Sequence, residues 1–175
     1  MKPYKLLSLL LASSAMLTTA CSDDDKLLPG NPTMDITGNL ESACFGDSLK
    51  FSIKASDPQV ALSTIHAELY FGDEMVSERV IRTKENGATY EGKLYVPYYA
   101  NIPDGQATLR LTLQNINFTI TEKTYNVAIT HPDYPSLTFR AETGEEYTMN
   151  REEKYVYSVT QRFPAEMRGV IVAPA

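Results

Sequence analysis

Four side chains in this sequence belong to the types that most readily hold metal ions or act as nucleophiles: Cys21, Cys44, His66 and His131. They are far apart, and none has a second Cys or His at the short spacing of a zinc site. We therefore expect no metal ion and no cofactor, with both histidines on the surface. Cys44 has no neighbouring histidine to activate its thiol, so we expect it to be a small buried side chain.

Carboxylates are more numerous, and there are 22 of them. They fall in predicted turns, near the N-terminus and in the segments GEEY and REEK. Two carboxylates can hydrolyse a glycoside only when the fold holds them about 5 to 10 Å apart across a cleft, and no pattern here predicts such a pair. The sequence also has no glycine-rich phosphate loop and no nucleophile elbow. We therefore expect no enzymatic activity.

Tyrosine is the remaining candidate for binding chemistry, because an aromatic ring can cover the apolar face of a sugar. The sequence has 11 tyrosines and no tryptophan, with a cluster at Tyr95, Tyr98 and Tyr99. Strand alternation predicts that Tyr98 points into the core, whereas Tyr95 and Tyr99 point outward as a candidate glycan platform. The alternative is that these tyrosines form ordinary cross-strand packing pairs.

The first twenty residues have the organisation of an export signal. Lys2 and Lys5 precede an apolar run over residues 6–17. A run of about a dozen residues has signal-peptide length and is too short to span a bilayer, which takes about 20 residues. We therefore predict a signal peptide over residues 1–20.

The residues around Cys21 resemble the lipobox of bacterial lipoproteins, in which a peptidase cleaves before a lipid-modified cysteine. Ala20 directly precedes Cys21, with Leu17, Thr18 and Thr19 ahead of it. Thr18 departs from the family, which usually has leucine at that position. The resemblance implies lipidation of Cys21 and membrane attachment through that lipid. The alternative is a secreted protein cleaved near Ala15 or Ala20, with Cys21 as a free thiol.

An acidic segment follows Cys21 and consists of Ser22, Asp23, Asp24 and Asp25. Like-charged short side chains repel one another and stay solvated, so residues 21–32 are predicted to be a flexible tether. The segment also resembles the export signal of Bacteroidetes lipoproteins. That resemblance implies transfer across the outer membrane, so that the protein faces the cell exterior.

The formal charge of −6, with no basic cluster along the sequence, disfavours nucleic acid as a partner. Removal of Lys2 and Lys5 with the signal peptide would make the charge more negative. An acidic surface also disfavours binding to anionic lipid headgroups. The lipid on Cys21 would then be the contact with the membrane.

Short runs with period-two alternation succeed one another between residues 35 and 130. In residues 48–55, for example, Leu49, Phe51 and Ile53 alternate with polar side chains, which is the pattern of a half-buried strand. Asn86-Gly87 tolerates the positive φ of tight turns and predicts a hairpin between strands at 75–84 and 90–98. Seven strands at intervals of about ten residues predict an all-β protein with an Ig-like β-sandwich over residues 33–131.

The proline-rich segment 131–135 predicts an interdomain linker. Three further strands are predicted beyond it, at residues 137–141, 155–160 and 168–173. They either complete or extend the first sandwich, or begin a second β domain that this sequence does not complete. We favour the second interpretation and assign residues 132–175 to the linker and the start of that domain.

The whole arrangement resembles the accessory surface glycan-binding lipoproteins of the starch-utilisation type in Bacteroidetes. The resemblance rests on the lipobox, the acidic tether, the Ig-like segment VPYYANIPDGQATLRLTLQN (residues 96–115) and the proline linker. In that family the membrane-proximal Ig-like domain is a spacer, later domains bind polysaccharide, and the partner is an outer-membrane transporter complex. No binding residue carries over, so we expect residues 22–175 alone to bind glycans weakly or not at all.

Two other functions remain open. The chain could be an adhesin or pilus-type component that binds protein partners through sheet edges. It could also be the non-catalytic N-terminal module of a secreted glycoside hydrolase.

A second, weaker resemblance concerns covalent modification. Asp47-Ser48-Leu49 is similar to the O-glycosylation acceptor of secreted Bacteroidetes proteins. It implies Ser48 as a candidate O-glycosylation site.

Overall fold

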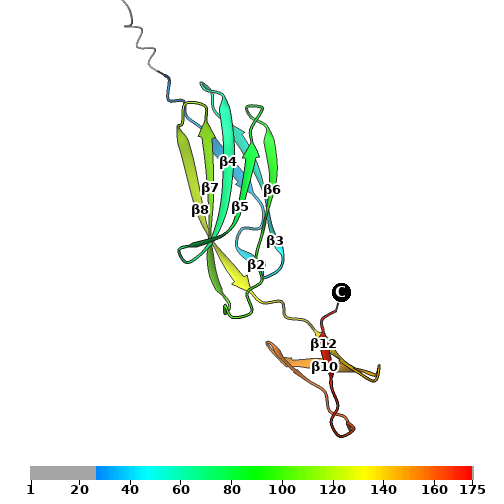
Figure 1. Ribbon diagram of the computed structural model, residues 1–175. Helices are drawn as coiled ribbons and strands as arrows, with labels where there is room; N and C mark the ends of the chain where they lie inside the picture. Colours follow the sequence, from blue (N-terminus) through cyan, green and yellow to red (C-terminus); the bar gives the residue numbers. More distant parts are fainter. Residues whose placement is uncertain (1–26, 175) are drawn as a thin grey trace, which may run out of the picture.

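A computed structural model describes residues 27–174. Within that range the chain forms strands, turns and loops without a helix, so no described segment is a helix that could cross a membrane. The strands form three sheets, two of which face each other as a sandwich (Figure 1). The prediction of an all-β sandwich is therefore confirmed. Cys21, Ser22, Asp23, Asp24 and Asp25 lie outside the described residues.

The two sheets of the sandwich are built from eight strands. The smaller sheet has the order β1-β3-β6 and is antiparallel; its strands are β1 (Thr33–Thr37), β3 (Ser48–Ser56) and β6 (Thr89–Tyr95). The larger sheet has the order β2-β8-β7-β4-β5, with β2 parallel to β8; its strands are β2 (Ser42–Cys44), β4 (Leu62–Phe71), β5 (Glu74–Arg82), β7 (Gly105–Asn115) and β8 (Ile120–Thr130).

The core lies between these sheets and follows the alternation of the sequence. Phe51 and Ile53 of β3 face Leu109 and Leu111 of β7 from the opposite sheet, and all four are at most 2% exposed. Burial of one such side chain contributes about 1.5 to 3 kcal/mol. Cys44, which we expected to be buried, lies in β2 and is only half-buried; its Sγ is 3.8 Å from Thr130 Oγ1.

The hairpin predicted at Asn86-Gly87 does not form. Strand β5 pairs with β4 and strand β6 pairs with β3, so this turn carries the chain from one sheet to the other. The Asn86 side chain accepts a hydrogen bond from the Asp57 N–H (2.8 Å) and donates one to the Asp57 carbonyl (2.6 Å). Gly87 has φ +76° and donates its N–H to the Ala55 carbonyl at 2.8 Å. The turn is therefore fixed to the end of β3.

A third sheet follows the segment 131–135 and lies beyond the end of the sandwich opposite the N-terminal segment (Figure 1). It is antiparallel, with the order β11-β10-β9-β12. Its strands are β9 (Ser136–Ala141), β10 (Glu146–Glu153), β11 (Val156–Ser158) and β12 (Gly169–Val172). Three of them lie in predicted strand segments, whereas β10 was not predicted.

Candidate functional site: two clamps and an apolar face

At the N-terminal end of the sandwich, a buried carboxylate accepts hydrogen bonds from the surrounding loops. Asp57 is 1% exposed and follows β3. Its Oδ1 accepts hydrogen bonds from the N–H groups of Gln59 (3.0 Å) and Val60 (3.1 Å). Its Oδ2 accepts hydrogen bonds from the Asn31 N–H (3.1 Å) and from Asn115 Nδ2 (3.0 Å). We call Asp57 and these four donors the N-terminal clamp.

The hydrogen bonds keep Asp57 ionised in spite of its burial. Burial raises the pKa of Asp57, but the hydrogen bond from Asn115 and those from three backbone N–H groups outweigh that effect. The net result is a pKa below the ordinary value of 3.8.

The clamp also holds the segment that leads into the sandwich. The Pro29 carbonyl accepts a hydrogen bond from Asn115 Nδ2 (2.7 Å), and the Leu28 carbonyl accepts one from Asn117 Nδ2 (2.7 Å). Gly30 has φ +73°, and a Cβ at that position would collide with the carboxylate of Asp57. Residues 28–32, which we expected to belong to the flexible tether, are therefore attached to the domain.

A second carboxylate lies at the opposite end of the sandwich and joins it to the third sheet. Asp104, just before β7, accepts hydrogen bonds from Lys154 Nζ (2.7 Å) and the Tyr155 hydroxyl (2.8 Å), both in the turn between β10 and β11. It also accepts the His131 N–H at 2.8 Å, and its Oδ1 lies 3.0 Å from His131 Nδ1. We call Asp104, His131, Lys154 and Tyr155 the C-terminal clamp. The bond from Lys154 and those from His131 and Tyr155 hold the pKa of Asp104 far below its ordinary value.

His131 is not the surface histidine that we predicted. Its side chain is 20% exposed, and its ring lies against Phe45 with centroids 4.5 Å apart. Tyr98 and Tyr155 approach the same ring edge-on at 5.6 and 6.1 Å. The other histidine, His66, is half-exposed, with Nδ1 3.9 Å from Glu78 Oε1.

The proline linker is held from the side of the third sheet as well. Asp133 forms an ion pair with Arg151 (2.7 Å) and accepts a hydrogen bond from the Tyr157 hydroxyl (2.8 Å). Burial raises the pKa of Asp133, but the bond from Tyr157, the Tyr155 N–H and the charge of Arg151 together lower it. The same Tyr157 hydroxyl accepts the Tyr134 N–H at 2.7 Å. These contacts fix the path of residues 131–135 on both sides.

Tyr95 and Tyr99 of the predicted platform are both exposed, as expected, at 54% and 40%, but they have different neighbours. Tyr95 lies on the outer face of the smaller sheet, opposite Ser48 in the register, and is 54% exposed. Tyr99 instead packs edge-on against Phe71 of the larger sheet, with centroids 6.1 Å apart. Tyr98, expected in the core, is 54% exposed because the chain leaves strand β6 at Tyr95 and inward alternation ends with Val96.

Two cavities lie near these predicted residues. Ser48 lines a polar cavity of about 370 Å³ together with Asp47 and Lys50. A cavity of about 330 Å³ next to the C-terminal clamp is lined by Phe45, Phe71 and Asp104, among others.

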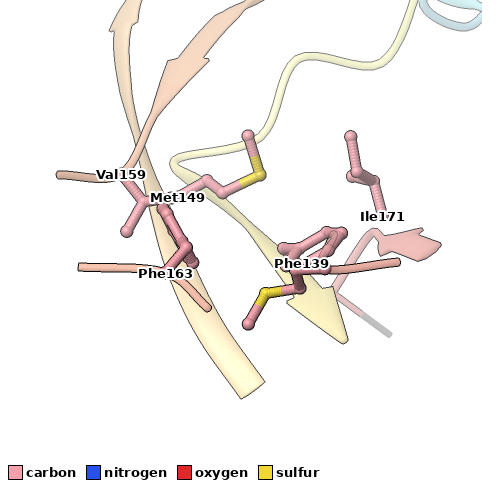
Figure 2. A pocket seen from close by; sticks show the side chains of 6 residues that line it. Phe139, Met149, Val159, Phe163 and Ile171 are labelled. Atoms are coloured by element: carbon pink, nitrogen blue, oxygen red, sulfur yellow. The ribbon is translucent and has the colours of Figure 1, made fainter. Parts of the chain in front are cut away.

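The third sheet has one apolar face. Cross-strand pairing places Leu137 and Phe139 of β9, Tyr147 and Met149 of β10 and Ile171 of β12 on that face. Figure 2 shows side chains from these strands around a cavity of about 370 Å³, which is completed by the segment between β11 and β12. Its lining residues are Phe139, Met149, Val159, Phe163, Met167 and Ile171. We call this surface the apolar face.

The two clamps hold chain segments in place through hydrogen bonds and ion pairs, and the apolar face offers a surface for contact. Within residues 27–174 no three Cys, His, Asp or Glu side chains are grouped so that they could hold a metal ion. Sequence reasoning missed Asp57 and Asp104 because each is a single aspartate beside a proline, outside the predicted strands, where solvated aspartates are common. Asp57-Pro58 directly after an alternating run was the only signal at the first position.

Comparison with known proteins gives a family without an assigned function. No curated protein matches this chain. One family, described as a domain of unknown function (DUF5016), matches residues 1–122, which cover the sandwich as far as the start of β8. The chain belongs to the DUF5016 family.

Proposed function

We propose that this protein is a lipid-anchored cell-surface protein of the bacterial outer membrane, whose sandwich is a rigid spacer without catalysis of its own. One end attaches to the membrane through Cys21, and the other end carries a region that serves glycan binding and uptake by a transporter complex. The observation that carries the proposal is that the segment after Cys21 and the junction with the third sheet are each held by a clamp. The two clamps lie at opposite ends of one strand.

That strand is β7. Asp104 of the C-terminal clamp directly precedes it, and Asn115 of the N-terminal clamp is its last residue. A strand of 11 residues extends by about 3.4 Å per residue and therefore separates the clamps by about 35 Å. A chain that served only as a flexible link would not fix both of its ends. The arrangement therefore suits a domain that sets a distance.

A second candidate function is protein contact through a sheet edge, as in an adhesin. Strand β12 is an edge of the third sheet, and its Val170 and Ile171 are 61% and 60% exposed. Exposed apolar edge strands are ready-made sites for the addition of another strand. A purified protein that assembles into chains through β12 would favour this function over the spacer.

The proposal is tested on intact cells that produce the full-length protein. We expect the wild-type protein to incorporate radiolabelled fatty acid, to fractionate with the outer membrane and to be degraded by proteinase K added outside. The Cys21→Ser variant should lose the label and leave the membrane fraction. Cys44→Ser is the matched control and should behave like the wild type.

Protection of the wild-type protein from external proteinase K would contradict surface display. Membrane association that survives in Cys21→Ser would contradict the lipid anchor.

A further inference from the structure

Two lysines on the outer face of the smaller sheet lie directly opposite each other. Lys50 of β3 pairs in register with Lys93 of β6, so both side chains leave the same face of adjacent strands. Like charges in this position repel each other and destabilise a sheet. Such a pair calls for an explanation beyond the stability of the fold.

A third cation reaches the same place from the other sheet. Arg79 lies on edge strand β5 and pairs with the fully buried Ala67, which puts it on the side of β5 that faces the smaller sheet. A cavity of about 350 Å³ is lined by Lys50, Arg79, Lys93 and the intervening Glu91 and Gly92. We call this cavity the cationic cleft. An inward-pointing charge on an edge strand can deter edge pairing, which accounts for Arg79 but not for the two lysines.

The residues that line the cleft carry more positive than negative charge. Among the described residues, none of these three cations lies within 4.0 Å of a carboxylate. Glu91 is the single acid among the lining residues, so cations outnumber anions there although the whole chain has a formal charge of −6. The three residues are far apart in sequence, and only the pairing of strands brings them together.

An exposed aromatic ring adjoins the cleft on the same face. Tyr95 is two residues beyond Lys93 on β6 and pairs with Ser48, two residues before Lys50. Residues at this spacing lie about 7 Å apart along a strand. The tyrosine is 54% exposed, so its ring is available for stacking.

We propose that the cationic cleft binds an acidic polysaccharide, with its carboxylate or sulfate groups on Lys50, Lys93 and Arg79 and a neighbouring sugar ring on Tyr95. Arg79 supplies a planar fork that fits a carboxylate or sulfate, and the lysines supply point charges. This inference rests on the proposed role in glycan uptake and names the class of glycan. It departs from the expectation that residues 22–175 alone bind glycans weakly or not at all, because the cationic cleft was not visible in the sequence. A densely charged polyanion such as nucleic acid, or an anionic membrane surface, would be repelled by the acidic remainder of the chain. A polysaccharide needs to place only a few acidic groups in the cleft.

The test is affinity electrophoresis of the full-length protein in neutral detergent, through native gels that contain polysaccharide. Partly de-esterified pectin is compared with fully methyl-esterified pectin, and sparsely sulfated dextran with dextran, so that each pair differs in charge and no polymer is densely charged. We expect retardation by the charged polymers alone, with added salt reducing it. The double variant Lys50→Ser/Lys93→Ser should raise the dissociation constant obtained from the retardation by roughly fivefold to tenfold, because two exposed ion pairs are lost. Tyr95→Ala should weaken it as well.

The matched control is Lys84→Ser/Arg162→Ser, which changes net charge equally at exposed positions outside the cleft. It should retain wild-type retardation. Equal weakening in this control, or no retardation of the wild type by either charged polymer, would overturn the proposal. So would binding to phosphatidylglycerol vesicles that depends on Lys50 and Lys93 in the absence of polysaccharide binding. Because the assay uses purified protein, its failure is distinguishable from failure of surface display on cells.

Discussion

At the scale of single residues, two aspartates hold the segments at the two ends of the sandwich in place. Asp57 begins the loop after β3 and Asp104 ends the loop before β7, at opposite ends of the sandwich. Each accepts several hydrogen bonds from groups distant in sequence. An ionised carboxylate suits this role because its two oxygens only accept and can serve several donors at once. The two clamps nevertheless differ in environment, since Asp57 is almost fully buried and Asp104 is partly exposed.

The first prediction concerns the replacement of Asp57 by asparagine, which keeps the shape of the side chain. The asparagine amide would present an NH₂ group either to Asn31 and Asn115 or to Gln59 and Val60, so that donors face donors. We expect a loss of about 3 kcal/mol in the free energy of unfolding, measured with urea. Asp73→Asn, in the exposed turn between β4 and β5, should change it by about 0.5 kcal/mol or less. Equal effects of the two variants would contradict the account of the N-terminal clamp.

The second prediction concerns pH. Because the pKa of Asp57 is lower in the folded protein than its ordinary value of 3.8, the folded state binds fewer protons at that carboxylate than the unfolded state. Its contribution to stability is therefore present above pH 3.8 and is lost as the pH falls through the folded pKa. Urea unfolding from pH 7 to pH 2 should show the difference between wild type and Asp57→Asn shrinking below about pH 4. A difference that stays constant to pH 2 would rule out this linkage.

At the scale of elements, the C-terminal clamp connects two sheets through residues 131–135, which the sequence predicts to be an interdomain linker. The His131 N–H is held by Asp104, and Lys154 and Tyr155 bring the turn between β10 and β11 to the same carboxylate. Hydrogen bonds that protect a backbone amide slow its exchange with solvent. The rate of exchange in residues 131–135 therefore reports on the clamp.

The third prediction is that Asp104→Ala speeds amide hydrogen exchange in residues 131–135 by at least about tenfold, because local opening loses several bonds of about 1 kcal/mol each. Exchange in the middle of β7 should not change. Glu145→Ala is the control, because Glu145 bonds to Thr143 and Tyr147 within the third sheet. Unchanged exchange in Asp104→Ala, or faster exchange throughout the sandwich, would be inconsistent with a clamp confined to the junction.

The fourth prediction uses neighbouring residues of β12 that are equally exposed but lie on opposite faces. Ile171 lines the cavity of the apolar face, whereas Val170 pairs with Arg140 on the polar face. Fluorescence of a hydrophobic dye such as ANS should fall in Ile171→Glu, because a negative charge enters the cavity and repels the sulfonate of the dye. It should be unchanged in Val170→Glu. A fall of the same size in both variants would mean that the dye binds elsewhere.

The elements show how far the sequence could predict the structure. Strand β3 was predictable because Leu49, Phe51 and Ile53 alternate strictly with polar residues. Strand β10 was not, because glutamates begin and end it and only Tyr147 and Met149 mark its apolar side. The Asn86-Gly87 turn was predictable as a turn. That its two flanking strands belong to different sheets was not, because turn chemistry does not determine which strands pair. Both clamps and the cationic cleft join residues distant in sequence, and no local pattern predicts such contacts.

At the scale of the whole molecule, the acidic chain brings three positive charges together at the cationic cleft, on the side of the sandwich between its two clamped ends. Lys50, Lys93 and Arg79 come from three strands and two sheets. A spacer that also touches acidic glycan along its side would retain polysaccharide near the membrane while a distal region binds it. That arrangement requires the domain to stand with its N-terminal end toward the membrane.

The orientation of the domain above the bilayer tests the central claim most directly. Donor dyes are attached to Glu85→Cys, near the N-terminal clamp, or to Val170→Cys in the third sheet, each on a Cys44→Ser background. The lipidated full-length protein is then placed in bilayers that contain an acceptor-labelled lipid. The account predicts strong energy transfer from position 85 and much weaker transfer from position 170, since a strand of about 35 Å separates the two ends. Equal transfer from the two positions, or stronger transfer from position 170, would contradict the spacer.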